Sequence, residues 1–342
     1  YPYEYNDKTP WGYDITSVEI YPGVTRIGNY AFRECPNLIA VDISRDGLAE
    51  IGNSAFSDCE QLKNVAVSSD LTTIGASAFG GTGLTGMMIP YSVTTIGDYA
   101  FSYMDNLEKV VFPKNLEVLS KSLFLQTNKL YDVTLPEKLK KIEHGALQVI
   151  NIHGKAKKLE LPSTLEKIED QAFGSTGYEE IVIPKGCVIE GEPFYGCSSL
   201  LKIVVDAEDP NYSNYDDCLY NKDQTVLICC PGGKSSVKFP STVKEVAQYG
   251  FAGNTKSLKS IELPNTITKL GDYVFGICYA LESVVLPESI TEIPTRAFQS
   301  CYRLKDITLP AKLKTIGELA FYSNDSLTSI TIPNTVESIG AE

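Results

Sequence analysis

The sequence predicts a repeat solenoid in which each turn of about 23 residues adds one strand to a parallel sheet. A bulky apolar residue, phenylalanine in all but one case, recurs at intervals of 21 to 26 residues, with one longer interval of 57. An isoleucine, leucine or valine lies five residues before each of these anchor residues, and a short apolar strand ending in proline precedes most of them. A period of 20 to 29 residues with one strand per turn is typical of leucine-rich repeats. The anchor residues are Phe32, Phe56, Phe79, Phe101, Phe124, Leu147, Phe173, Phe194, Phe251, Phe275, Phe298 and Phe321.

The segment Ser283–Leu304 shows the elements of one turn in order. Val284 and Leu286 point inward from a strand with period 2, which Pro287 ends because proline has no amide hydrogen to donate. A second extended segment follows, and then a short helical or irregular segment carries Phe298 into the interior. One such turn leaves both of its apolar flanks open, so neighbouring copies must stack on it.

Composition limits the classes of partner. The 342 residues form one predicted domain, because the core of a repeat array grows in one dimension. No apolar run approaches the roughly 18 residues of a membrane helix, so we expect no membrane insertion by this segment. The formal charge of −13 argues against nucleic acid as a partner, because nucleic acid requires a basic surface.

The two ends of the sequence differ from the repeats. Residues 1–16 are rich in tyrosine and include Trp11, which predicts an N-terminal cap on the first turn, with a carbohydrate-stacking platform as the alternative. They contain no signal peptide. The final repeat stops after the pair Ile339-Gly340 and before any Ala-Phe, so we expect a truncated repeat and a longer native protein.

Two small residue types recur at fixed places in the turn. A glycine follows the inward isoleucine at Gly28, Gly52, Gly75 and Gly97, where we expect a sharp turn or a positive φ. Cysteine occupies the third position after several anchors, and threonine or asparagine fills it elsewhere. Such a slot favours a small buried residue, so we predict unpaired thiols over disulfides. These cysteines are Cys35, Cys59, Cys197, Cys278 and Cys301.

The long interval between anchors contains a predicted hairpin insertion over residues 206–233. Cys218-Leu219-Tyr220 and Val226 to Cys230 are expected to pair around a turn at Asn221 to Gln224. Carboxylates are densest here, so calcium is one hypothesis, although the spacing is not that of an EF-hand. A solvated acidic hairpin is the interpretation that we favour. The residues of this insertion that we predict to contact a partner are Asp209, Tyr212, Tyr215 and Asp216.

The sequence contains no motif of a known catalytic or cofactor site. GxSxG, HExxH, CxxC and Walker patterns are absent, so we predict no enzyme, no catalytic residue, no cofactor and no metal. A glycosidase carboxylate pair has no predicted cleft to line. His144 and His153 offer a pH-sensitive or metal-binding pair, but we interpret them as surface residues of an irregular turn.

The strings IELPNTITKLGDYVFGICYAL and MMIPYSVTTIGDYAFSYMDNL closely resemble the leucine-rich repeats of BspA-like bacterial surface proteins, and the resemblance covers almost the whole chain. It implies a right-handed superhelix at the cell surface or secreted from the cell. It also implies binding to other macromolecules, with adhesion to host proteins among the suggested roles. The insertion is similar too, although the usual Asp-Gly before the hairpin is here Asp217-Cys218.

One outward position on each strand forms a row across the predicted sheet. We predict that part of this row contacts a partner, which is a protein (extracellular matrix or surface proteins of a host) or a glycan. A preference of exposed strand positions for valine and threonine explains the same pattern without a partner. The predicted function is therefore a monomeric, non-enzymatic binding module, with a passive structural stalk as the alternative. The row residues concerned are Ala66, Met88, Val111, Thr134, Glu160, Val182 and Val204.

Overall fold

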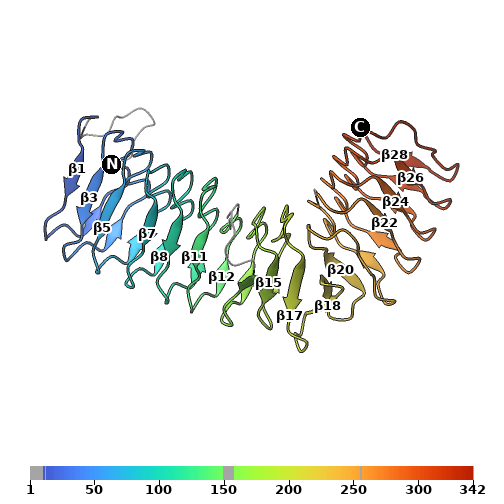
Figure 1. Ribbon diagram of the computed structural model, residues 1–342, viewed down its shortest axis with the longest axis horizontal. Coiled ribbons are helices and arrows are strands. Elements are labelled where there is room, and N and C mark those ends of the chain that lie inside the picture. The colour runs from blue at the N-terminus through green and yellow to red at the C-terminus, as the bar shows by residue number, and fades with distance from the viewer. Residues whose placement is uncertain (1–10, 12, 149–157, 255, 342) are drawn as a thin grey trace. The chain divides into compact units, whose positions relative to one another are not determined.

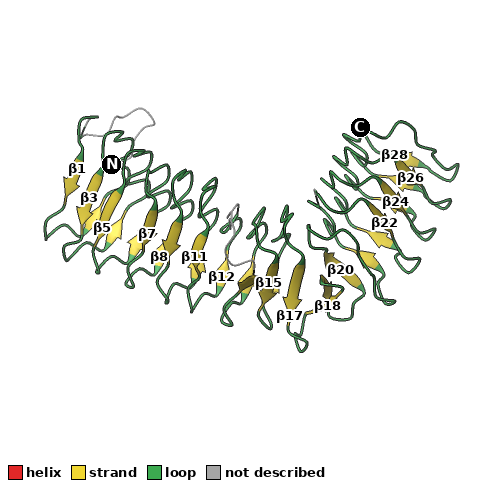
Figure 2. Cartoon of the chain, viewed as in Figure 1, coloured by secondary structure: helices red, strands yellow, loops and turns green. Residues whose placement is uncertain are grey.

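The chain is built of strands and turns. The computed structural model describes residue 11 and residues 13–148, 158–254 and 256–341, and these contain no helix (Figure 2). Of the two predicted alternatives, the segments that connect the strands are therefore irregular turns and not short helices. The residues fall into two compact units. Unit 1 consists of Tyr1–Lys155, Pro162–Gly174 and Ile189–Pro193, and unit 2 of Ala156–Leu161, Ser175–Val188 and Phe194–Glu342. The single domain over residues 1–342 stays a prediction.

Each turn of unit 1 contributes a strand of three or four residues and a strand of two residues. Within each ladder, strands of one kind pair in parallel and in register with their counterparts in the next turn (Figure 1). The longer strands form the ladders β1-β3-β5 and β7-β9-β11, and the shorter ones include β2-β4-β6-β8 and β10-β12-β14. The longer strands are β1 (Ser17–Glu19), β3 (Ala40–Ile43), β5 (Asn64–Val67), β7 (Gly86–Met88), β9 (Lys109–Val111) and β11 (Asp132–Thr134). The shorter strands are β2 (Arg26–Ile27), β4 (Glu50–Ile51), β6 (Thr73–Ile74), β8 (Thr95–Ile96), β10 (Val118–Leu119), β12 (Lys141–Ile142) and β14 (Lys167–Ile168).

Unit 2 repeats the same arrangement around an insertion. Its longer strands form the ladders β13-β15-β17 and β22-β24-β26, and the insertion β18-β19-β20 continues into β21-β23. The longer strands are β13 (Lys158–Glu160), β15 (Glu180–Ile183), β17 (Lys202–Val205), β22 (Ser260–Glu262), β24 (Ser283–Val285) and β26 (Asp306–Thr308). The others are β18 (Tyr212–Tyr215), β19 (Cys218–Asn221), β20 (Val226–Cys229), β21 (Glu245–Val246), β23 (Lys269–Leu270), β25 (Glu292–Ile293), β27 (Thr315–Ile316) and β28 (Ser338–Ile339), with β16 (Val188–Ile189) at the boundary of the units.

The anchor residues form a continuous column in the core of each unit, as predicted. Successive rings from Phe32 to Phe124 in unit 1 stack with centroids 5.4 to 6.1 Å apart. The rings from Phe251 to Phe321 in unit 2 stack at 5.0 to 5.3 Å. Trp11 stacks on Phe32 at 5.6 Å, where a cap would lie. The cap itself stays a prediction, because residues 1–10 and 12 lie outside the described residues.

The backbone on each side of an anchor adopts a left-handed conformation. Tyr30 and Glu34, two residues before and after Phe32, have φ of 59° and 53°. The same two positions flank Phe275, where Tyr273 and Ile277 have φ of 57° and 61°. This alternation directs every second amide toward the next turn: the N–H groups of Tyr30, Phe32 and Glu34 all donate to carbonyls one turn on, at 2.8 Å. The irregular segment therefore hydrogen-bonds from turn to turn as a strand does.

The glycines after the inward isoleucines have a different role from the one expected. Gly28, Gly52, Gly75 and Gly97 do not have positive φ. Instead, an added Cβ at Gly97 would lie 2.4 Å from the amide nitrogen of Ala76, and one at Gly75 would lie 2.6 Å from the backbone of the preceding turn. Gly28 begins the series and would meet nothing within 4 Å. The close approach of consecutive turns therefore favours glycine at Gly75 and Gly97, although Ser120 and Glu143 occupy the same position in later turns.

The slot after the anchor selects a small hydrogen-bond donor. The thiol of Cys59 donates to the carbonyl of Phe32, the anchor one turn earlier, at 3.0 Å. All nine cysteines are thiols, and burial raises the pKa of Cys59 and of Cys301 to about 12. The predicted preference for thiols agrees with this structure. Equivalent bonds to the preceding anchor come from Thr127 (2.8 Å), Cys278 (3.2 Å), Cys301 (3.1 Å) and Asn324 (2.9 Å).

Candidate binding surface

The predicted row residues lie in register on the longer strands of each unit. In unit 1, Met88 and Thr134 both pair with Val111, and Ala66 pairs with Asp42 on the preceding strand. In unit 2, Glu160 pairs with Val182, which pairs with Val204. Ala66, Met88, Thr134 and Glu160 are exposed, and the three valines are half-buried. The exposed fraction of Met88 is 76%.

The ladder of longer strands in unit 1 is interrupted beside Met88. Among the described residues no pairing joins β5 to β7, although each pairs with its other neighbour. The preceding turn is short at this point: Leu84 follows Phe79 by five residues, whereas Leu62 follows Phe56 by six. Because the two strands part, the inward side chains Val65 and Val67 of β5 are only half-buried.

An apolar pocket opens at this interruption. Its volume is about 250 Å³, and no charged residue lines it. Valine and methionine side chains form its walls, and a methionine can adapt its shape to a partner because its side chain is unbranched. The sequence contained a signal for this site, the shortened turn after Phe79. The lining residues are Val65, Val67, Leu84, Gly86, Met87, Met88 and Pro90.

The shorter strands are interrupted between β8 and β10 in unit 1 and between β23 and β25 in unit 2, and a proline lies at the second of these places. The residue after the inward apolar residue elsewhere donates its amide to the preceding turn, as Gly271 does to Val246 (2.9 Å) and Gly317 to Ile293 (2.8 Å). Pro294 stands at this position and has no amide hydrogen to donate. A polar pocket of about 440 Å³ lies there. Its charged lining residues are Glu245, Lys269, Asp272 and Glu292.

The predicted hairpin of β19 and β20 is confirmed, and a third strand, β18, pairs with β19 on its other side. Asp216 and Asp217 make the tight turn between β18 and β19, with φ of 48° and 63°. Positive φ at both central residues defines a type I′ turn, which favours glycine or asparagine. The turn therefore forms despite the replacement of glycine by Cys218.

The four predicted contact residues of the insertion are placed differently from one another. Asp209 is fully buried, and its carboxylate accepts hydrogen bonds from the amides of Gly186, Asn211 and Tyr212 at 2.7 to 2.8 Å. Its predicted role as a partner contact is therefore wrong, because no surface of it is available. Tyr212 and Asp216 are half-buried. Tyr215 is 38% exposed, with its ring edge-on to Tyr220.

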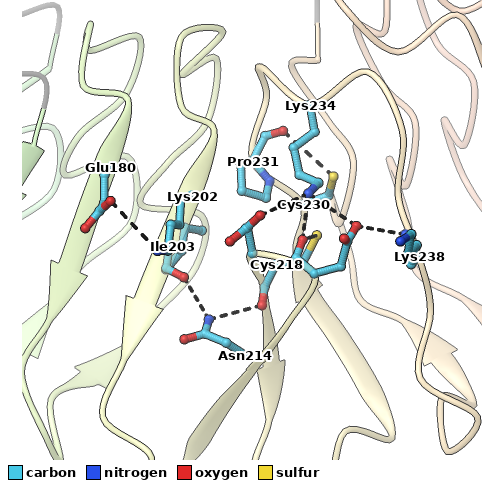
Figure 3. Close-up of polar contacts among 11 residues, drawn as sticks. Glu180, Lys202, Ile203, Asn214, Cys218, Cys230, Pro231, Lys234 and Lys238 are labelled. Atoms are coloured by element: carbon cyan, nitrogen blue, oxygen red, sulfur yellow. Dashed lines mark hydrogen bonds and ion pairs between the residues drawn. The ribbon is translucent and has the colours of Figure 1, made fainter.

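Lys234 holds the acidic turn in place, as Figure 3 shows. Its ammonium lies 2.7 Å from the carbonyl oxygen of Asp216, 3.2 Å from the Asp216 carboxylate and 3.5 Å from that of Asp217. Burial opposes the charge on Lys234, but Cys218 and the two aspartates offset this effect and raise the pKa of the amine. The turn carboxylates are thus paired within the protein.

The structure assembles no metal site from the residues that it describes. Nowhere in the described ranges do three histidine, cysteine, aspartate or glutamate side chains converge as metal ligands would. The Nδ1 atom of His144 lies 3.3 Å from the Asp170 carboxylate, and His153 lies outside the described residues. Among the described residues there is no helix that is long and apolar enough to cross a membrane.

In-register parallel strands, a turn of about 23 residues and a central column of rings define the class as a leucine-rich repeat solenoid. The chain belongs to the BspA-type leucine-rich repeat family. The family described as "BspA type Leucine rich repeat region" matches residues 12–108, 152–222 and 230–342, with six copies of its repeat.

Similar solved structures come from bacteria. A leucine-rich cell surface protein from Faecalibacterium prausnitzii A2-165 is 25% identical, with a TM-score of 0.67, covering 96% of this chain and 88% of its own. A leucine-rich repeat protein from Bacteroides ovatus ATCC 8483 is 26% identical, with a TM-score of 0.59, and the match covers 95% of this chain and 83% of the other. The pneumococcal vaccine antigen PcpA is 22% identical, with a TM-score of 0.52, and the match covers 96% of this chain and 84% of the other. At this identity the similarity supports the fold only. The comparison with curated proteins gave no match.

Proposed function

We propose that this chain is a non-enzymatic binding module of a bacterial cell surface or secreted protein, which holds a partner protein on the longer strands of unit 1. The observation that carries the proposal is the apolar pocket at the interruption between β5 and β7, with Met88 exposed beside it. Membership of the family and the resemblance to a leucine-rich cell surface protein support the extracellular location.

The pocket offers two kinds of interaction to a protein. Its valines and methionines can bury an apolar side chain of the partner, which contributes about 25 cal/mol per Å² of apolar surface removed from water. The facing edges of β5 and β7 carry backbone groups that are not paired with each other, and an extended peptide recognises such groups by main-chain hydrogen bonds. A glycan offers little apolar surface, so we favour a protein. Host extracellular matrix or surface proteins are the partners that the family resemblance suggests.

A passive stalk is the second candidate function, and the outward positions of unit 2 favour it. The ladder β22-β24-β26 is continuous there, and two of its central outward residues are polar, Glu262 and Thr308. An ion pair of 3.3 Å between Lys305 and Glu282 joins consecutive turns beside it. Such a surface stabilises stacking and presents no pocket.

A binding screen with matched variants distinguishes the two functions. The purified chain is immobilised and tested against extracellular matrix proteins, host surface proteins and glycans. For a ligand found in this way, Met88→Glu should weaken binding at least tenfold, because burying a methionine contributes about 2 kcal/mol and a buried carboxylate adds a penalty. Val285→Glu is the control, since Val285 is 52% exposed on β24 of a continuous ladder.

If Met88→Glu and Val285→Glu weaken binding equally, or if neither weakens it, the pocket is excluded as the binding site. Loss of binding in Tyr215→Ala alone would assign the contact to the insertion instead. Substitution of Tyr215 is preferable to deletion of residues 206–233, because the deletion would also remove β20, which pairs directly with β21 of the following turn. Failure to bind any member of the panel would favour the stalk.

A further inference from the structure

Two cysteines of the insertion face each other across neighbouring strands. Leu219 on β19 pairs with Cys229 on β20, in antiparallel register. Extending this register by one residue places Cys230, which directly follows β20, opposite Cys218. The side chains of Cys218 and Cys230 then point to the opposite face of the hairpin from Leu219 and Cys229. Cys218 and Cys230 both belong to the apolar core around Phe251. The thiol of Cys218 donates to the carbonyl of Asp216 at 3.4 Å, and that of Cys230 donates to the carbonyl of Pro231 at 3.8 Å.

Backbone hydrogen bonds show the geometry of this pair. The amide of Cys230 donates to the carbonyl of Gly250 at 2.8 Å, away from β19. Cys218 pairs with Tyr215 of β18, and its carbonyl accepts from the side chain of Asn214 at 3.1 Å, away from β20. The extended register thus makes the two cysteines a non-hydrogen-bonded pair, for which ideal antiparallel geometry gives a Cα separation of about 4.5 Å. A disulfide spans Cα separations of about 4.4 to 6.8 Å, so no backbone movement is needed to form one.

The surroundings of the two sulfurs are polar for a buried site. The ammonium of Lys234 and the thiol of Cys218 both donate to the carbonyl oxygen of Asp216, at 2.7 and 3.4 Å (Figure 3), and the side chain of Lys234 is only 12% exposed. The hydroxyl of Tyr220, which is fully buried, has no hydrogen-bond partner in the structure. The pKa of Tyr220 is raised by burial and by the neighbouring Cys218 and Cys230, which places its phenol near the same sulfurs.

We propose that Cys218 and Cys230 are a redox-active dithiol, which a peroxide converts to a cross-strand disulfide that closes the β19–β20 hairpin covalently. The site lies one layer below the surface, since the exposed Asp217 directly precedes Cys218. A small oxidant such as hydrogen peroxide therefore reaches it through a small opening of the turn. Lys234 is a positioning residue, whose ammonium holds the Asp216-Asp217 turn from which Cys218 extends.

The reaction proceeds in two balanced steps. One sulfur, as the thiolate, attacks an oxygen of hydrogen peroxide, the O–O bond breaks, and the departing hydroxide takes up the proton of that thiol to form water. The second sulfur then attacks the resulting sulfenic acid, so that the S–S bond forms and the S–O bond breaks. The second hydroxide takes the proton of the second thiol. Two thiols lose two electrons and two protons, and one peroxide becomes two waters.

The other cysteines lack this arrangement. Cys229 is adjacent to Cys230 and more exposed, but it lies on the other face of the hairpin. Cys278 and Cys301 occupy the slot in consecutive turns, and each thiol donates to the carbonyl of the preceding anchor instead. Reaction should therefore depend on pairing and not on exposure alone.

Mass spectrometry of the full chain tests the proposal. The reduced protein is treated with increasing hydrogen peroxide, the remaining thiols are blocked with N-ethylmaleimide, and tryptic peptides are analysed without reduction. Cleavage after Lys222 separates Cys218 from Cys230, so the disulfide appears as two linked peptides. We expect this linkage to be the first oxidation product. Earlier oxidation of any other cysteine, or no linkage at an excess of peroxide, would overturn the proposal.

Three variants identify the sulfur and the role of the lysine. Cys230→Ser should reduce the linkage at least tenfold, whereas Cys229→Ser, which keeps the other member of the vicinal pair, should leave it unchanged. The reverse result would refute the assignment. Lys234→Met should slow formation of the disulfide severalfold while far-UV circular dichroism of the reduced protein stays the same. An unchanged rate in the folded variant would remove Lys234 from the reaction.

Discussion

Gly97 and Gly28 occupy the same position of the repeat, and the structure predicts that the same substitution in them has opposite effects. Both follow an inward isoleucine in unit 1, and neither has a positive φ. A Cβ at Gly97 would lie 2.4 Å from the nitrogen of Ala76 and 2.7 Å from its Cα atom, whereas one at Gly28 would meet nothing within 4 Å. Gly97→Ala should therefore destabilise unit 1, and Gly28→Ala should not.

The magnitude follows from the distances. Ordinary contact begins near 3.4 Å, so the two turns must separate by about 1 Å at Gly97. The hydrogen bond from Gly97 to the carbonyl of Ile74, 2.8 Å long, would then be lost at about 1 kcal/mol. Overpacking costs about 1 to 3 kcal/mol more, and the smaller entropy of the unfolded alanine chain returns about 0.4 to 1 kcal/mol. The expected net loss is about 1 to 3.6 kcal/mol for Gly97→Ala, against a gain of up to about 1 kcal/mol for Gly28→Ala.

Equilibrium unfolding in urea, followed by far-UV circular dichroism, measures both variants against the parent chain. The midpoint of Gly97→Ala should fall and that of Gly28→Ala should stay or rise, with similar dependence on urea concentration. Equal shifts in the two variants would refute the conclusion that close approach of turns, and not local backbone conformation, requires the glycine.

Three further predictions concern the core and its titration. Phe275→Ala should cost about 3 to 5 kcal/mol, since it removes a fully buried ring stacked between Phe251 and Phe298, and an unchanged urea midpoint would place that ring outside the core. Burial and the adjacent Asp170 raise the pKa of Glu192 to about 9, so the folded state binds this proton more tightly than the unfolded state does. Its contribution to stability is complete below about pH 4.5 and is lost as the pH rises to about 9; thermal unfolding across this range should therefore show a flatter pH dependence in Glu192→Gln. Titration with a thiol reagent should count nine thiols in denaturant and few in the native protein, because burial protects them, and a count of one or none in denaturant would contradict the thiol assignment.

The repeat made most of the fold predictable, because the column of anchors from Phe32 to Phe321 depends only on period and side-chain type. The left-handed positions were not predictable from residue type, since Tyr30 and Ile277 fill places where glycine would be expected. Hydrogen bonds to the next turn hold these residues in a conformation that they seldom adopt alone. The sequence predicted a sharp turn or a positive φ at Gly97, whereas the constraint on this residue comes from the neighbouring turn.

The candidate binding surface was also only partly predictable from the sequence. The outward row was predictable because side chains alternate along a strand, and Met88 lies where the pattern placed it. The interruption that makes the pocket beside it depends on the spacing of two turns, which a shortened loop alone does not determine. Asp209 was mistaken for a surface carboxylate, because sequence does not show that three backbone amides would surround it. Pro294 was a readable signal, since its missing amide can be inferred from sequence alone.

The close contact at Gly97 also bears on how this protein can diversify. Where main chain touches main chain, the rise from one turn to the next is set by atoms common to all amino acids, and the solvent-facing side chains do not contribute to it. Substitutions at outward positions such as Met88 can therefore accumulate with little effect on the scaffold. Such a molecule can acquire new specificities while its architecture remains constant.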